Sequence, residues 1–205
     1  GDRPLMRLDA LGLVNSNLLA VHMTQLSERE RDRLAATGAH VIHCPEANMK
    51  LASGFCPVAD LADRSVCLAL GTDGAASNND LDLLGEMRSA ALIAKGVSGN
   101  AAALPAWQAI EMATLGGAKA LGREHEMGSL KVGKAADLIS LDLTQPEARP
   151  LHQVISQVVY ATGRHQVRHA WINGAHVLAD RTVVSLDEAE ILARADEWRD
   201  KLQKR

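Results

Sequence analysis

Three side chains that can bind metals or move protons stand at the ends of three apolar segments. His22 and Asp73 each follow an apolar run, and His43 is the last residue of the run His40–His43. Histidine and aspartate bind divalent metals and transfer protons near neutral pH. Each alone has a plainer explanation, because an aspartate readily caps a helix and a lone histidine usually packs in a core. In adjacent parallel strands, the three side chains would meet at one edge of the sheet, which predicts a metal-binding or proton-transfer site.

The segments around these residues alternate between predicted strands and helices. Apolar runs predict strands at 18–21, 40–43 and 66–70. Periodicity, capping and glycine signals predict helices at 4–11, 27–38, 57–63, 81–95 and 104–121, with a loop at 44–54. This repeat is typical of a parallel barrel or a doubly wound sheet.

The pattern changes after residue 127. A glycine turn leads into a predicted strand within residues 128–142, and Asn173-Gly174 between two apolar runs predicts a hairpin over 167–178. These strands are expected to form a separate small β element. A charged amphipathic helix is predicted over residues 186–204.

Composition argues against several classes of protein. The 205 residues carry a net charge of −3 and few aromatics, whereas nucleic-acid-binding proteins are usually basic. No apolar run approaches the roughly 20 residues that span a bilayer, and the first residues lack the pattern of a secretory signal. Cys44, Cys56 and Cys67 show no paired metal-ligand spacing. We therefore expect a reduced, cytoplasmic protein with no nucleic-acid or membrane partner.

Three motifs together resemble the amidohydrolase superfamily. They are Val21–Leu26, His43–Gly54 and Leu70–Asn79, and they are most similar to its 5-methylthioadenosine/S-adenosylhomocysteine deaminase branch. The resemblance extends over nearly the whole chain, including residues 128–142.

The resemblance implies an α/β fold that is the C-terminal part of a metal-dependent (β/α)₈ TIM barrel. It would comprise about strands 6–8, part of a small β-sandwich and a C-terminal helix. We expect residues 1–127 in the partial barrel and residues 128–185 in the sandwich segment, with 146–165 a candidate return to the barrel. Residues 186–205 would form the terminal helix.

The chemistry implied by the resemblance is hydrolytic deamination of adenine nucleosides such as 5′-methylthioadenosine, S-adenosylhomocysteine or adenosine. One divalent metal, expected to be Zn²⁺, would activate water to attack C6 of adenine and release ammonia. Asp73 would be the strand-8 metal ligand and proton relay, and His22 the strand-6 histidine that hydrogen-bonds the attacking group. Asp73 and His22 would also contact the substrate, and Ser77, His43 and Asn48 are weaker candidates for doing so.

The chain departs from the family pattern in its metal ligands. No two histidines have the His-x-His spacing of the family's first strand, and Gln25, three residues after His22, cannot replace the glutamate expected after the fifth-strand histidine. The remaining ligands are therefore expected N-terminal to this sequence, and the main partner would be the missing N-terminal half of the barrel. Whether the protein forms a homo-oligomer stays open.

Two alternatives remain at this point. A related amidohydrolase would act on guanine, cytosine or an s-triazine, because a fold does not fix a function. A non-catalytic half-barrel would serve as an interaction module. Other polar residues are expected to have surface or packing roles, and these are Glu86, Arg88, His125, His165 and His169.

Overall fold

The computed structural model describes residues 3–203. Three strands, β1 (Leu19–Val21), β2 (His40–His43) and β3 (Cys67–Leu70), form a parallel sheet in the order β1-β2-β3. The predicted parallel arrangement is therefore confirmed. Because β2 lies in the middle, β1 and β3 are the two edges of this sheet, and within residues 3–203 neither edge has a further strand beside it.

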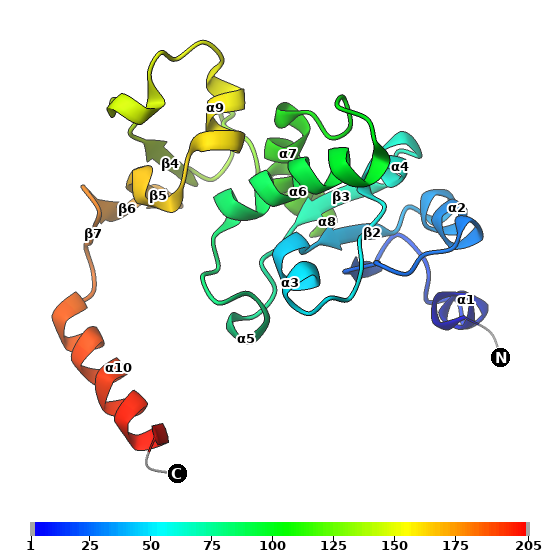
Figure 1. The fold of residues 1–205 in the computed structure, drawn as a ribbon, viewed down its shortest axis with the longest axis horizontal. Coiled ribbons are helices and arrows are strands. Elements are labelled where there is room, and N and C mark those ends of the chain that lie inside the picture. Colours follow the sequence, from blue (N-terminus) through cyan, green and yellow to red (C-terminus); the bar gives the residue numbers. More distant parts are fainter. Residues whose placement is uncertain (1–2, 204–205) are drawn as a thin grey trace.

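Helix α1 precedes β1, and the other helices of this unit follow the strands in sequence and lie beside the sheet (Figure 1). Their bounds are α1 (Pro4–Ala10), α2 (Glu28–Thr37), α3 (Pro45–Lys50), α4 (Val58–Asp63), α5 (Ala75–Asn78), α6 (Leu83–Ser98), α7 (Ala106–Ala113) and α8 (Leu115–Ala120). The prediction of a loop over residues 44–54 is wrong because that segment contains α3. The predicted single helix at 104–121 is two helices, since the backbone leaves helical geometry at Thr114 (φ −131°, ψ −92°).

Local sequence signals explain where helix α2 begins and ends. Ser27 and Glu30 form a capping box at the start of α2, in which each side chain accepts a hydrogen bond from the backbone N–H of the other. Gly38 ends the helix in the left-handed conformation (φ 70°), which glycine adopts without steric cost. The predicted helix is therefore confirmed in both its start and its end.

Apolar side chains of the sheet and helices form one core. Val41 of β2, Leu34 of α2, Leu61 of α4 and Ala90 of α6 are all fully buried within it. Helix α8 approaches β3 so closely that a Cβ on Gly116 would lie 2.3 Å from the carbonyl oxygen of Leu68. Burial of this apolar surface is the main force that holds the helices on the sheet.

A second sheet contains β4 (Leu138–Leu141), β5 (Val167–Ile172), β6 (Ala175–Ala179) and β7 (Thr182–Val183), all antiparallel. Asn173 and Gly174 form the turn between β5 and β6, both with positive φ, which confirms the predicted hairpin.

The connection between β4 and β5 contains helix α9 (Val154–Ala161), flanked by 3₁₀ turns at Pro146–Ala148 and Arg164–Gln166. Helix α9 packs against α6 and α7, and Val159 is fully buried there. Arg88 of α6 donates a hydrogen bond to the carbonyl of Thr162 (3.0 Å), which agrees with the surface or packing role expected for it. The predicted domain divisions after residues 127 and 185 stay predictions.

Helix α10 (Glu188–Gln203) confirms the terminal helix predicted from sequence. None of its residues is buried, and it extends away from both sheets (Figure 1). Across residues 3–203, no helix combines the length and apolarity needed to cross a membrane. The three cysteines are free thiols.

Candidate active site

His22 and Asp73 lie next to each other beyond the carboxyl ends of the two edge strands. His22 directly follows β1, and its backbone N–H donates to the carbonyl of Ile42 (3.0 Å), which continues the ladder to β2. Asp73 follows β3. Both residues have positive φ (71° and 62°), which turns the chain away from the strand direction. The Nε2 atom of His22 lies 3.8 Å from Oδ2 of Asp73, and both side chains remain partly exposed. The structure thus brings this pair together.

Asn48 orients the ring of His22. Its side-chain oxygen Oδ1 lies 2.9 Å from Nδ1 of His22. Because a carbonyl oxygen can only accept, this contact places a proton on Nδ1, and Nε2 is the ring nitrogen that faces Asp73. Asn48 belongs to α3 and is only 3% exposed, so the contact comes from a buried side chain.

Ser77 orients the carboxylate of Asp73. Its hydroxyl donates to Oδ2 of Asp73 at 2.7 Å and belongs to α5, the short helix that follows. The hydrogen bond from Ser77, together with a second from the backbone N–H of Gly74 and the nearby ring of His22, lowers the pKa of Asp73 below its ordinary value. Asp73 is therefore an ionised carboxylate near neutral pH, able to accept a proton or a metal.

His43 reaches the same end of the sheet but is enclosed there. It is 2% exposed, and its Nδ1 atom has no hydrogen-bond partner within residues 3–203. Burial, with a smaller contribution from His22, lowers the pKa of His43 to about 4. A neutral, enclosed imidazole of this kind is unsuited to carrying protons near neutral pH. The structure therefore gives His43 a different environment from the open ring of His22.

Glu86 lies behind the site, and from the sequence it was expected to have only a surface or packing role. Its side chain is fully buried, which excludes a surface role, and accepts hydrogen bonds from Nδ2 of Asn78 (2.7 Å) and from the backbone N–H of Glu46 (3.2 Å). Burial raises its pKa to about 7. The available signal was its spacing, since Glu86 stands four residues before Ala90 and eight before Ala94, on the buried face of α6.

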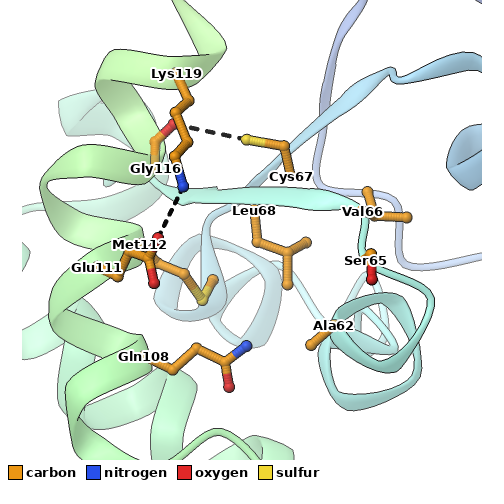
Figure 2. Close-up of a pocket in the computed structure, with 10 residues that line it drawn as sticks. All are labelled: Ala62, Ser65, Val66, Cys67, Leu68, Gln108, Glu111, Met112, Gly116 and Lys119. Carbon is orange, nitrogen blue, oxygen red and sulfur yellow. Dashed lines mark hydrogen bonds and ion pairs between the residues drawn. The ribbon is translucent and has the colours of Figure 1, made fainter. Parts of the chain in front are cut away.

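Two cavities border this unit. One of about 270 Å³ is formed by residues 3–5, 21–26 and 30, and therefore adjoins His22. The other, of about 280 Å³, lies beside the free edge of β3 (Figure 2). Side chains from β3 and the neighbouring helices line it, with Lys119 bound to Glu111 at 2.9 Å across one side. Neither His22 nor Asp73 contributes to this second cavity.

The donors present fit one side of a zinc site. A carboxylate and an imidazole nitrogen are among the ligands that zinc uses, and Asp73 and His22 present one of each to the same space. Zinc in proteins generally takes at least three protein ligands. Within residues 3–203 no cluster of three or more His, Cys, Asp or Glu side chains could hold a metal. The described residues alone therefore do not make up a complete set of zinc ligands.

The family of the chain follows from its sequence pattern together with this arrangement. The pattern of the Amidohydrolase family matches residues 2–177. The chain belongs to the amidohydrolase family. This match includes all three strands of the parallel sheet and both residues of the His22–Asp73 pair.

Curated amidohydrolase relatives extend well beyond the matched segment. A protein of Teredinibacter turnerae named 5-methylthioadenosine/S-adenosylhomocysteine deaminase is 49% identical over 98% of this chain and 46% of its own length. A protein of the same name from Saccharophagus degradans is 45% identical over 99% of this chain, again 46% of the relative. The chain therefore spans about half the length of these relatives, and the matched part is their C-terminal half.

Solved structures of similar proteins also match this chain over about half of their own length. An adenosine deaminase from Xanthomonas campestris with bound zinc superposes with a TM-score of 0.97 at 54% identity, covering 100% of this chain and 47% of that one. An atrazine chlorohydrolase from Arthrobacter aurescens complexed with zinc gives a TM-score of 0.89 at 25% identity, covering 95% and 43%. The α/β fold described above is therefore an amidohydrolase fold.

Proposed function

We propose that this chain supplies the C-terminal half of a metal-dependent aminohydrolase. In this proposal β1, β2 and β3 are strands 6, 7 and 8 of a (β/α)₈ barrel, and the antiparallel strands belong to a small β-sandwich. Two observations support it: the chain spans about 46% of its relatives, and both edges of the parallel sheet are free within residues 3–203. Free sheet edges are a liability that further strands would remove.

The observation that carries the proposal is the contact between His22 and Asp73. Each is held by its own partner, His22 by Asn48 at 2.9 Å and Asp73 by Ser77 at 2.7 Å. Asp73 would hold a divalent metal, with zinc favoured because it is bound in the Xanthomonas relative, and the other ligands would come from the N-terminal half.

A bound divalent metal lowers the pKa of water to about 7 and so makes a nucleophile available near neutral pH. Asp73, an ionised carboxylate, accepts the proton of the attacking water and passes it on toward the leaving amino group. His22, whose Nδ1–H donates to the side-chain oxygen of Asn48, presents Nε2 to the reacting group and orients it. These roles fit the partial exposure of both side chains, which lets them reach a substrate.

The substrate is proposed to be an adenine nucleoside, namely 5′-methylthioadenosine, S-adenosylhomocysteine or adenosine, with the inosine analogue and ammonia as products. The names of the relatives at 45–54% identity support this choice over a triazine, because the triazine-hydrolysing structures are 25–26% identical. Substrate contacts by Ser77, His43 and Asn48 stay predictions. A place in cytoplasmic nucleoside metabolism belongs to the same proposal, as does the possibility of a homo-oligomer.

A chimera tests the proposal without knowledge of the native N-terminal half. Residues 1–205 replace the matched C-terminal part of the Xanthomonas campestris deaminase, giving what we term the assembled enzyme. Bound zinc is measured by metal analysis, and ammonia release is measured with the three nucleosides, guanine, cytosine and an s-triazine.

We expect the assembled enzyme to bind zinc and to release ammonia from adenine nucleosides, whereas residues 1–205 purified alone do neither. Release from guanine, cytosine or the triazine alone would overturn the substrate proposal. Zinc binding and deamination by the isolated chain would overturn the half-barrel proposal. A folded assembled enzyme that acts on none of the six compounds would favour a non-catalytic module.

A further inference from the structure

The buried side chain of Glu86 joins the two short helices that carry the partners of His22 and Asp73. Oε1 accepts from Nδ2 of Asn78, the neighbour of Ser77 on α5. Oε2 accepts from the backbone N–H of Glu46, two residues before Asn48 on α3. One carboxyl group thus ties both helices to α6.

Helices α3 and α5 depend on such contacts for their position. They contain six and four residues, whereas isolated helices shorter than about 12–15 residues are marginal in water. Two further hydrogen bonds connect α3, α5 and α6. Lys50 on α3 donates to the carbonyl of Ala76 on α5 (2.9 Å), and Ser89 on α6 donates to the carboxylate of Glu46 on α3 (2.7 Å). Lys50 also donates to the side-chain oxygen of Asn79 at the end of α5, so it ties α3 to α5 directly, whereas Glu86 ties both helices to α6.

Asn78 links Glu86 to the segment that carries Ser77. Its amide nitrogen donates to Glu86, and its Oδ1 accepts from the backbone N–H of Leu81 at 2.7 Å. Both functions of the amide are therefore used, and its orientation is fixed. Because Glu86 is fully buried, it does not reach a substrate, so its influence on chemistry must be exerted through these neighbours.

We propose that Glu86 is a positioning residue of the active site. By fixing α3, it holds Asn48 against His22. By fixing α5, it holds Ser77 against Asp73. The inference rests on the proposed function, since it gives these contacts a purpose in deamination, and a misplacement of about 1 Å in such a site can cost about 10²-fold in rate.

Two variants isolate this hydrogen-bond pattern. Glu86→Gln keeps the shape of the side chain but replaces one acceptor oxygen with an amide donor, which then faces the N–H group of Asn78 or of Glu46. The double variant Glu86→Gln with Asn78→Asp reverses the donor and acceptor and rebuilds the bond. The carboxylate that this double variant has at position 78 can still accept the hydrogen bond from the backbone N–H of Leu81. Ala94→Gly is the matched control, because Ala94 is buried on α6 outside this network and glycine weakens the helix.

In the assembled enzyme, we expect Glu86→Gln to lower kcat by about 10- to 100-fold, with KM changed by less than about threefold and zinc content unchanged. The double variant should recover about tenfold or more of that loss. Ala94→Gly should lower the melting temperature and leave kcat unaltered. In a crystal structure of Glu86→Gln, the contact between Asn48 and His22 should exceed about 3.5 Å, the limit of a hydrogen bond.

An unchanged kcat in Glu86→Gln, or a loss that the double variant does not recover, would overturn the positioning role. Inactivity of the unsubstituted assembled enzyme toward every nucleoside would instead overturn the proposed function. In that case the crystal structures still decide about Glu86: if Glu86→Gln leaves the Asn48–His22 and Ser77–Asp73 contacts unaltered, the inference is wrong.

Discussion

The buried carboxyl group of Glu86 should make a pH-dependent contribution to the stability of the protein. Burial raises the pKa of Glu86 from 4.5 to about 7, and the neighbouring carboxylate of Glu46 adds to the effect. The folded state therefore binds this proton more tightly than the unfolded chain does. The stabilising contribution is fully present below pH 4.5, is lost as the pH rises toward about 7, and is absent above it.

The size of this effect follows from the two pKa values. Moving a carboxyl pKa from 4.5 to about 7 corresponds to about 3 kcal/mol in the free energy of unfolding. His43 acts in the opposite direction, because burial lowers its pKa from 6.5 to about 4 and the unfolded chain then binds its proton more tightly. Its contribution grows with pH over nearly the same window and is of similar size, about 3 kcal/mol. The two effects should largely cancel in the unsubstituted protein.

Glu86→Gln separates the two contributions. The variant lacks the contribution of Glu86 to the free energy of unfolding, which falls as the pH rises, and keeps that of His43, which grows as the pH rises. The free energy of unfolding of the variant relative to that of the unsubstituted protein should therefore increase by about 3 kcal/mol between pH 4.5 and 7. Denaturant unfolding of the assembled enzyme at closely spaced pH values measures this difference. His43→Gln should give the opposite trend. A difference between Glu86→Gln and the unsubstituted protein that stays constant over this range would refute the reasoning.

Two further predictions concern the packing that supports the site, each measured by denaturant unfolding of the assembled enzyme. Ser27→Ala removes the hydroxyl that bonds to Glu30 in the capping box and should cost about 1–2 kcal/mol, while Ser27→Thr should cost less; equal losses would contradict the capping role. Gly116→Ala places a methyl group 2.3 Å from the carbonyl of Leu68 and should cost about 1–3 kcal/mol or more. Gly117→Ala meets no atom within 4 Å and should cost nothing, so equal effects of the two glycine variants would show that α8 does not press on β3.

The elements that could be predicted from sequence are those with strong local signals. The capping box and Gly38 define α2, the Asn-Gly turn defines the β5–β6 hairpin, and short apolar runs define the three parallel strands. The pairing of His22 with Asp73 followed from these strands, because the carboxyl ends of parallel strands lie at one edge.

The features that were missed depend on contacts between distant residues. Helix α3 is too short for its local sequence to reveal it, and it is held by contacts with distant residues, among them the hydrogen bond from the backbone N–H of Glu46 to Glu86, forty residues later. The break at Thr114 accompanies the close approach of Gly116 to β3, which no periodicity predicts. The bond between Asn48 and His22 likewise joins residues 26 apart. Such contacts exist only once the sheet and helices have packed.

The most direct test of the account is the effect of Asp73→Asn on metal binding and turnover in the assembled enzyme. The substitution keeps the shape of the side chain but removes the carboxylate that Ser77 orients. We predict weaker zinc binding and a fall in kcat of about 10²- to 10⁴-fold, the range that a positioned proton acceptor contributes. Asp63→Asn, at an exposed carboxylate on α4, should change neither quantity. Retention of most of the activity and of the zinc by Asp73→Asn would leave Asp73 a structural residue and contradict the account.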